Sequence, residues 1–242
     1  MAYELHYWPT IQGRGEFVRL ALEAAGAPYT DVARGVDDSA RGESALLRLL
    51  QDDAQAHPPF APPFLKDGPV VVGQTAAILL YLAPTLKLVA RSEQARIWTH
   101  QIQLTIADIV SEAHDTHHPV GTGLYYEDQK PEALRSAKAF CAERIPKYLH
   151  WFERILVRNP AGSRHLVGGR LSYADLSLFQ LIEGLRYAFP KATARTLSGT
   201  PGIAGLHDRI AALPKVAAYL RSERRLPFNE QGIFRRYPEL DL

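Results

Sequence analysis

The chain has 242 residues, of which 46% are hydrophobic and 22% charged, a composition typical of soluble globular proteins with a sizeable core. Its formal net charge is +2, so composition alone indicates neither nucleic acid nor an anionic membrane as a partner. The single cysteine, Cys141, excludes an intrachain disulfide and any Cys-x-x-Cys site for zinc or redox chemistry. The longest apolar runs are far shorter than the roughly 20 residues of a transmembrane helix, so we expect a soluble, cytoplasmic protein.

The first third of the chain mixes strand and helix patterns. Residues 2–7 and 28–33 alternate as short strands, while residues 14–25 repeat apolar side chains every three or four positions, as in a helix. Residues 34–60 are polar and contain one weak helical pattern, in SALLRLLQDD. This part of the chain therefore begins as β-α-β, followed by a segment that the pattern defines poorly.

A hairpin and a helix complete this part. Two strand-like pieces, PFLK and PVVV, flank Asp67-Gly68, a dipeptide typical of tight hairpin turns. The segment QTAAILLYLA follows as a helix, with Thr75 as its expected N-cap. The sequence thus predicts a compact α/β domain over residues 1–84.

After Pro84 the strand patterns end and helical patterns take over. Residues 85–91 are the expected linker to an all-helical domain over residues 91–242. We expect helices over 92–118, 131–157 with a kink at Pro146, 172–187, 202–212 and 214–222. The third of these should begin with a capping box formed by Ser172 and Asp175.

Several short motifs combine into one pattern. They are Tyr7 at the end of the first strand, Arg14 in a Gly-Arg-Gly helix start, Pro63 in a Pro-x-Leu segment, Gln74-Thr75 at a helix start, and Ser172-x-x-Asp175. In this order and spacing they resemble the cytosolic glutathione S-transferases, in particular the sigma, mu, pi and alpha-like classes that use a tyrosine. The resemblance covers nearly the whole chain. It implies a thioredoxin-like N-terminal domain that binds glutathione, an all-helical C-terminal domain and a homodimer.

The resemblance assigns catalysis to Tyr7, with Arg14 in support. A free thiol has a pKa near ~8.5, so little of it is the nucleophilic thiolate at neutral pH. A phenolic O–H aimed at the sulfur donates a hydrogen bond that favours the thiolate, and an arginine at the first helical turn adds a nearby cation. Thr10 is the rival hydroxyl, because related classes use a side chain slightly further along this loop. Ordinary packing at a strand end and a structural ion pair are the alternatives for Tyr7 and Arg14.

Five residues are implied to hold glutathione: Pro62, Pro63, Gln74, Thr75 and Asp108. Pro63 matches the family's cis-proline, which presents the backbone before it to the cysteinyl part of glutathione. Here that preceding residue is Pro62, which has no N–H, so one of two main-chain hydrogen bonds is missing and weaker binding is expected. Gln74 and Thr75, at a helix start, offer N–H groups to the γ-glutamyl carboxylate. An ordinary N-cap at Thr75 is the alternative.

The helix over 92–118 carries further candidates. The resemblance implies that Asp108 of the partner subunit reaches the γ-glutamyl ammonium, whereas a solvated acidic face is the plain alternative. We expect the electrophile between the Tyr7 loop and this helix, against Trp8, Pro9 and Leu104, in an apolar pocket.

Histidines and the cysteine receive structural interpretations. His114, His117 and His118 have a spacing that can hold a metal, but no pattern elsewhere supplies another ligand, so we expect no metal and a polar helix end that lines the substrate cleft. Cys141 falls in an apolar stripe and should be buried.

The predicted activity is transfer of the glutathione thiolate to an apolar electrophile, with glutathione as co-substrate. A binding protein of the same fold without turnover, or a glutathione-dependent peroxidase or isomerase, are the alternatives. A glutaredoxin-type reductase is disfavoured because the N-terminal domain contains no cysteine. No nucleic acid or membrane partner is expected. The group that binds the glycyl carboxylate stays open among Arg41, Arg48 and His57.

Overall fold

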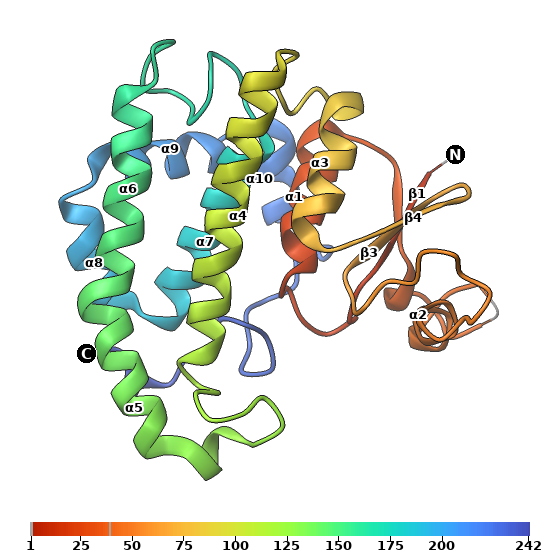
Figure 1. Cartoon of the computed structure of the whole chain (residues 1–242), viewed down its shortest axis with the longest axis horizontal. Coiled ribbons are helices and arrows are strands. Elements are labelled where there is room, and N and C mark those ends of the chain that lie inside the picture. The colour runs from red at the N-terminus through yellow and green to blue at the C-terminus, as the bar shows by residue number, and fades with distance from the viewer. Residues whose placement is uncertain (1, 39) are drawn as a thin grey trace. The chain divides into compact units, whose positions relative to one another are not determined.

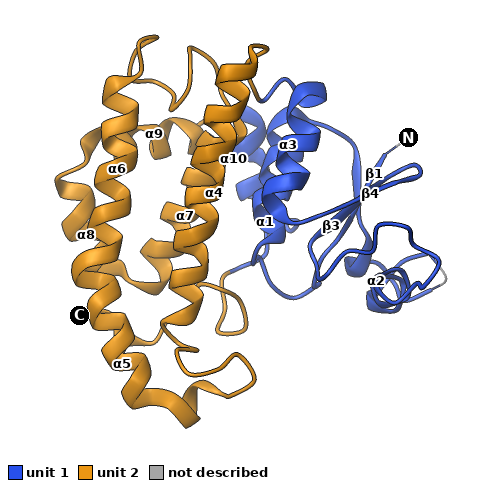
Figure 2. Ribbon diagram, viewed as in Figure 1, with its two compact units in different colours: residues 1–88, 213–227 blue, residues 89–212, 228–242 orange. Residues whose placement is uncertain are grey.

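The computed structural model describes residues 2–38 and 40–242 and divides into two compact units. The first unit contains residues 1–88 together with 213–227, and the second contains residues 89–212 together with 228–242 (Figure 2). The sheet-bearing unit thus includes a segment from near the end of the chain. Whether residues 85–91 link two independently folding domains, as we expect from the sequence, stays a prediction.

A four-stranded sheet forms the centre of the first unit. Its order is β2-β1-β3-β4, with β1 parallel to β2 and antiparallel to β3, and β3 antiparallel to β4. The strands are β1 (Tyr3–His6), β2 (Tyr29–Asp31), β3 (Phe64–Asp67) and β4 (Val70–Gly73). The helices of this unit are α1 (Gly15–Ala25), α2 (Glu43–Leu50), α3 (Thr75–Leu86) and α10 (Pro214–Leu220), with a 3₁₀ turn at Val32–Arg34.

Alternation along the strands places apolar side chains on both faces of this sheet. Leu5 and Leu65 pack with the apolar faces of α1 and α3, whereas Phe64 packs with Ala33 and with Leu46 of α2 (Figure 1). The parallel β1–β2 pair is joined by α1, and the antiparallel β3–β4 pair is joined at Asp67-Gly68, as expected. This arrangement confirms the thioredoxin-like prediction.

The second unit is built from helices, as predicted. They are α4 (Glu93–Asp115), α5 (Lys130–Ala139), α6 (Ile145–Arg158), α7 (Tyr173–Ala188), α8 (Pro190–Ser198) and α9 (Pro201–Ala211), with a π segment at Phe140–Arg144 and 3₁₀ turns at Tyr126–Gln129 and Pro238–Leu240. In the part of the chain that the structure describes, no helix is long and apolar enough to cross a bilayer.

One predicted helix is interrupted and one helix was missed. The pattern over 131–157 contains a π turn immediately before Pro146, because this proline lacks an N–H and cannot continue regular hydrogen bonding. Helix α8 escaped prediction because its cap is remote: the Asp241 carboxylate accepts the N–H groups of Lys191 and Ala192 at 2.8 and 3.1 Å. A cap supplied from fifty residues away leaves no local pattern.

Two structural predictions are confirmed in the second unit. Ser172 and Asp175 form the expected capping box, in which Asp175 also accepts the N–H of Leu166 at 2.7 Å. Cys141 is 4% exposed, and burial raises the pKa of its thiol, which fits a small core residue and not a nucleophile.

A buried charge network joins α1 to the 213–227 segment. The Glu16 carboxylate, fully buried at the first turn of α1, accepts from the Tyr219 hydroxyl at 2.7 Å and from Arg225 at 2.5 Å. Arg19, also fully buried, lies 3.4 Å from Glu16 and 2.6 Å from Asp31 of β2. These carboxylates hold the pKa of the Arg19 guanidinium above its ordinary value. Glu16 therefore neutralises two buried or half-buried cations at once.

Replacing Glu16 with glutamine should lower the free energy of unfolding by at least about 3 kcal/mol, because removing one partner of a buried ion pair leaves the other uncompensated. Urea unfolding of Glu16→Gln followed by circular dichroism measures this loss. Glu43→Gln is the matched control, since Glu43 also lies in a first helical turn but is exposed, so its change should stay within about 0.5 kcal/mol. Equal losses in both variants would contradict the role of Glu16.

Candidate active site

Three of the predicted site residues lie next to the ends of neighbouring strands, at one end of the sheet; this end is called the sheet edge below. The last paired residues of the ladder are His6 with Phe64, and Phe64 with Gly73. The next residues along these strands are Tyr7, Pro63 and Gln74, which therefore leave the sheet side by side at the same edge.

The hydroxyl of Tyr7 is fixed by the backbone at the start of α1. Its oxygen accepts the N–H of Arg14 at 2.9 Å, and the side chain is 4% exposed. Burial raises the pKa of the phenol, with a smaller opposite effect from the Arg14 N–H, so the group stays protonated at neutral pH. A hydroxyl whose oxygen accepts one hydrogen bond is polarised toward donating another. Arg14 contributes here first through its main-chain N–H and then through its positive charge, and the sequence indicated only the charge.

Two glycines allow this close approach and were not recognised as site residues. A Cβ atom at Gly13 would overlap the Tyr7 hydroxyl, and one at Gly15 would overlap the ring. Gly13 also has a φ of +44°, a backbone conformation that side chains disfavour. The Gly-Arg-Gly sequence is thus what lets the phenol lie flat on the start of α1. The only feature of the sequence that could have indicated this close approach is the presence of a glycine on each side of Arg14.

The start of α3 lies against the same backbone. The Thr75 hydroxyl donates to the carbonyl oxygen of Arg14 at 3.2 Å, so the expectation that Thr75 caps α3 is wrong. The N-cap is Gln74, whose backbone has φ 64° and ψ 120°, a sparsely populated region for a residue with a side chain. This conformation leaves the exposed Gln74 side chain at the mouth of the helix, beside first-turn N–H groups that lack intrahelical acceptors.

Pro62 and Pro63 lead into β3 through a cis peptide bond, as the resemblance implies. Pro63 is buried, while Pro62 is half-buried. Since Pro62 has no N–H, only its carbonyl oxygen can bind a peptide alongside this edge.

The residues after Tyr7 take different positions. Trp8 is half-buried and packs against the core cluster of Ala33, Leu46 and Phe64, which is a structural contact. Pro9 is half-buried and Thr10 is exposed. The hydroxyl of Tyr7 is held by the start of α1.

Leu104 and Asp108 belong to the second unit, on α4. Both are exposed, whereas Ile102 and Ile109 on the same helix are fully buried, as the helical pattern predicted. Asp108 lines a cavity of about 570 Å³ together with side chains of α6. The structure contains one chain, so any role across a dimer stays a prediction.

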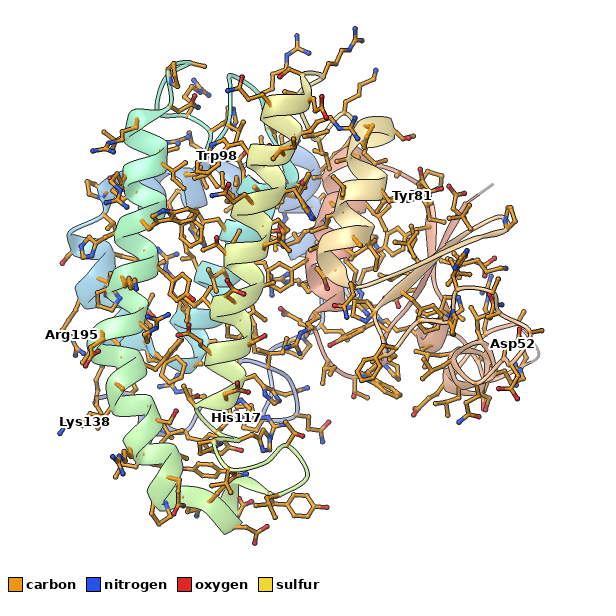
Figure 3. The ribbon with its side chains drawn as sticks, in the orientation of Figure 1. Asp52, Tyr81, Trp98, His117, Lys138 and Arg195 are labelled. Atoms are coloured by element: carbon orange, nitrogen blue, oxygen red, sulfur yellow. The ribbon has the colours of Figure 1, made fainter. Side chains whose placement is uncertain are left out.

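The three histidines lie where α4 ends and pack against one another. The ring of His114 lies 5.0 Å from the rings of both His117 and His118. His117 is buried, its Nε2 lies 2.8 Å from the Ile233 carbonyl oxygen, and burial lowers its pKa to about 3 (Figure 3). His117 therefore acts as a neutral packing residue that holds the C-terminal segment. Among residues 2–38 and 40–242, no cluster of histidine, cysteine and carboxylate side chains is arranged to bind a metal.

The candidates for the glycyl carboxylate lie near α2. Arg48 donates to the Asp38 carbonyl oxygen at 2.8 Å, and Arg41 and Arg48 line a cavity beside Lys66, while His57 is exposed. This geometry does not single out one of the three.

Comparison with known proteins supports the interpretation of the fold and the resemblance to glutathione S-transferases. Residues 114–223 match the family model described as the glutathione S-transferase C-terminal domain. Glutathione S-transferase P 1 of Xenopus laevis is 27% identical over 228 residues, covering 92% of this chain and 93% of the relative. Glutathione S-transferase A3 of Mus musculus is 28% identical and covers 93% of this chain and 92% of the relative.

A solved structure agrees with the sequence relatives. The Pi-class glutathione S-transferase of Onchocerca volvulus superimposes with a TM-score of 0.71 at 22% identity, covering 96% of this chain and 99% of that one, which shows the shared fold. Relatives that align over more than nine-tenths of the chain, a matching C-terminal domain and a common fold support the resemblance to the cytosolic glutathione S-transferases.

Proposed function

We propose that this chain is a glutathione transferase that joins the glutathione thiolate to an electrophilic carbon of an apolar compound. The sulfur forms a new bond to carbon and a leaving group departs, or a proton is added to the product where the electrophile is an activated double bond. The observation that carries the proposal is the protonated Tyr7 hydroxyl at the sheet edge, which accepts from the Arg14 N–H and keeps its own proton to donate.

The rest of the peptide would bind along the same edge. The Pro62 carbonyl oxygen accepts the cysteinyl N–H, in the manner of an added strand. The γ-glutamyl carboxylate meets the first-turn N–H groups of α3 and the Gln74 side chain. The Thr75 hydroxyl donates to Arg14, so it positions the helix start and does not itself donate to the carboxylate. Arg14 therefore connects the thiol end of the site to the carboxylate end.

A homodimer completes the proposal. Asp108 of the partner subunit would pair with the γ-glutamyl ammonium, because this exposed carboxylate on α4 makes no hydrogen bond or ion pair among the residues that the structure describes. Leu104 and Pro9 remain proposed contacts of the apolar substrate. The family relationship supports a cytoplasmic dimer but supplies no interface residues for this chain.

The Tyr7→Phe variant should raise the thiol pKa of bound glutathione by about 1–2 units, because a hydrogen bond to a charged group contributes about 1.5–3 kcal/mol. Titration of the enzyme-bound thiolate by ultraviolet absorbance measures the shift, and kcat at neutral pH should fall by about 10- to 100-fold. Tyr3→Phe is the control, since it removes a phenol from the same strand without touching the edge. An unchanged thiol pKa in Tyr7→Phe would rule out the tyrosine mechanism.

The Pro62→Ala variant should bind glutathione more tightly, by about 2- to 12-fold, because it restores an N–H donor worth a net ~0.5–1.5 kcal/mol. Isothermal titration calorimetry with glutathione gives the affinity. Pro58→Ala is the control for the loss of a proline ring, because Pro58 is exposed in the same segment. Weaker binding in Pro62→Ala would show that the peptide does not use this main chain.

The Asp108→Asn variant should raise KM for glutathione several-fold with little change in kcat, because it removes a charge that contacts the γ-glutamyl end, far from the sulfur. Steady-state kinetics and sedimentation test this together. Asp115→Asn lies two turns further on α4, is also exposed and should be silent. A monomer in sedimentation, or equal effects of the two variants, would remove the role across the dimer.

A further inference from the structure

Arg19 of α1 is fully buried in the first unit, and the proposed reaction gives it no role. Its Nε donates to the Asp31 carboxylate of β2 at 2.6 Å, and its Nη1 donates to the Glu16 carboxylate at 3.4 Å. An arginine is almost never buried completely unless its charge is paired. The two carboxylates therefore explain how the guanidinium stays in the core, and they hold it at one place.

The guanidinium lies over the ring of Tyr7. The Cζ atom of Arg19 is 5.7 Å from the ring centroid, and both side chains are buried. A cation within about 6 Å of an aromatic face is attracted by the ring, and more strongly where water is excluded. Burial raises the pKa of the Tyr7 phenol, whereas the charge of Arg19 acts in the opposite direction. The cation therefore holds the ring and also makes its hydroxyl a better hydrogen-bond donor.

The same guanidinium holds the loop that follows Tyr7. Its Nη1 donates to the carbonyl oxygens of Ile11 and Gln12 at 3.5 and 3.4 Å. Two residues after this point, the N–H of Arg14 donates to the Tyr7 hydroxyl at 2.9 Å. Arg19 therefore contacts both partners of this hydrogen bond: the ring that carries the hydroxyl and the loop that leads to the N–H.

These contacts require the shape of a guanidinium as well as its charge. The Nε of Arg19 donates to Asp31 while the Nη1 of the same planar group donates to the loop carbonyls. A lysine ammonium is a compact point charge, so it cannot make all of these contacts at once. An arginine at this position is therefore suited to holding two pieces of main chain and a ring together.

We propose that Arg19 is a positioning residue of the proposed reaction, which holds the Tyr7 ring and the loop after it so that the Tyr7 hydroxyl stays aimed at the glutathione sulfur. This inference rests on the proposed function. Among residues 2–38 and 40–242, the contacts of Arg19 involve none of the residues proposed to bind the γ-glutamyl and cysteinyl parts of glutathione. Loss of Arg19 should therefore impair thiol activation and leave the affinity for glutathione nearly unchanged.

The test removes the buried ion pair from the full chain. Arg19→Met with Asp31→Asn deletes one charge of each sign, and Glu16 keeps its bond to Arg225 at 2.5 Å, so neither carboxylate position retains an unpaired charge. Ultraviolet titration of bound glutathione should show a thiol pKa raised by about 0.5–1 unit, and kcat near neutral pH should fall by about three- to tenfold. The dissociation constant of glutathione, measured by calorimetry, should change by less than about twofold.

A combined variant shows whether Arg19 acts through Tyr7. If the guanidinium positions the phenol, then Arg19→Met with Asp31→Asn should cause no further rise of the thiol pKa in a Tyr7→Phe background. A general loss of packing would not depend on the phenolic hydroxyl. An equal rise of the thiol pKa with and without that hydroxyl would show that Arg19 acts on the thiolate directly, which would overturn the positioning role.

Three further variants separate position from charge and from folding. Asp31→Asn alone keeps the guanidinium and an oxygen that accepts from it, so the thiol pKa should rise by less than about 0.2 unit. Arg19→Lys keeps the buried charges paired but lacks the planar group, so it should raise the thiol pKa by about 0.5 unit, and it gives the same test if the Met and Asn variant does not fold. Glu23→Gln with Arg224→Met removes a different ion pair of α1, at 2.9 Å, and should have no effect.

Failure of this inference and failure of the proposed function give different results. If Tyr7→Phe itself leaves the thiol pKa unchanged, the tyrosine mechanism is wrong and the role of Arg19 falls with it. If Tyr7→Phe raises the thiol pKa but neither Arg19→Met with Asp31→Asn nor Arg19→Lys does so, only the positioning role of Arg19 is overturned.

Discussion

The contact between the Tyr7 phenol and the backbone of residues 13–15 is the constraint on which the candidate site depends. It brings the end of β1 against the start of α1, and it requires glycine on both sides of Arg14. The Arg14 carbonyl then receives the Thr75 hydroxyl, so the start of α3 is tied to the same three residues. A sheet edge and two helix starts are thereby positioned by one short loop.

The same helix start is held from its other side by a distant part of the chain. Glu16 directly follows the glycine pair and binds Tyr219 and Arg225, which lie about two hundred residues later. The Gln12 side chain also donates to the Leu226 carbonyl oxygen. Because Glu16 and Gly15 share a peptide bond, movement of the 213–227 segment would be transmitted to the Tyr7 contact. The late segment is therefore part of the support of the site as well as of the first unit.

The sequence predicted those structural elements that are stabilised by interactions between neighbouring residues, and it missed those that depend on remote residues. The hairpin at Asp67-Gly68 and the capping box at Ser172 depend on neighbouring residues, and both were predictable. Helix α8 depends on Asp241, and the placement of residues 213–227 depends on Glu16, so neither left a pattern within its own segment. Helical periodicity identified α10 but could not indicate which unit it joins, because its apolar face would fit any apolar neighbour.

The same distinction between local and remote interactions applies to the candidate site. Motifs in the sequence pointed to Tyr7 and Gln74, but they did not indicate that the Arg14 N–H donates to Tyr7 or that the Thr75 hydroxyl donates to the Arg14 carbonyl oxygen, since both bonds depend on close approach of the Arg14 backbone. In the proposed site, the groups offered to the γ-glutamyl carboxylate are N–H donors at the start of α3, and the position of this helix start depends on the bond between the Thr75 hydroxyl and the Arg14 carbonyl oxygen. Selectivity for a peptide co-substrate would then depend on backbone positions that the contacts of Arg14 fix.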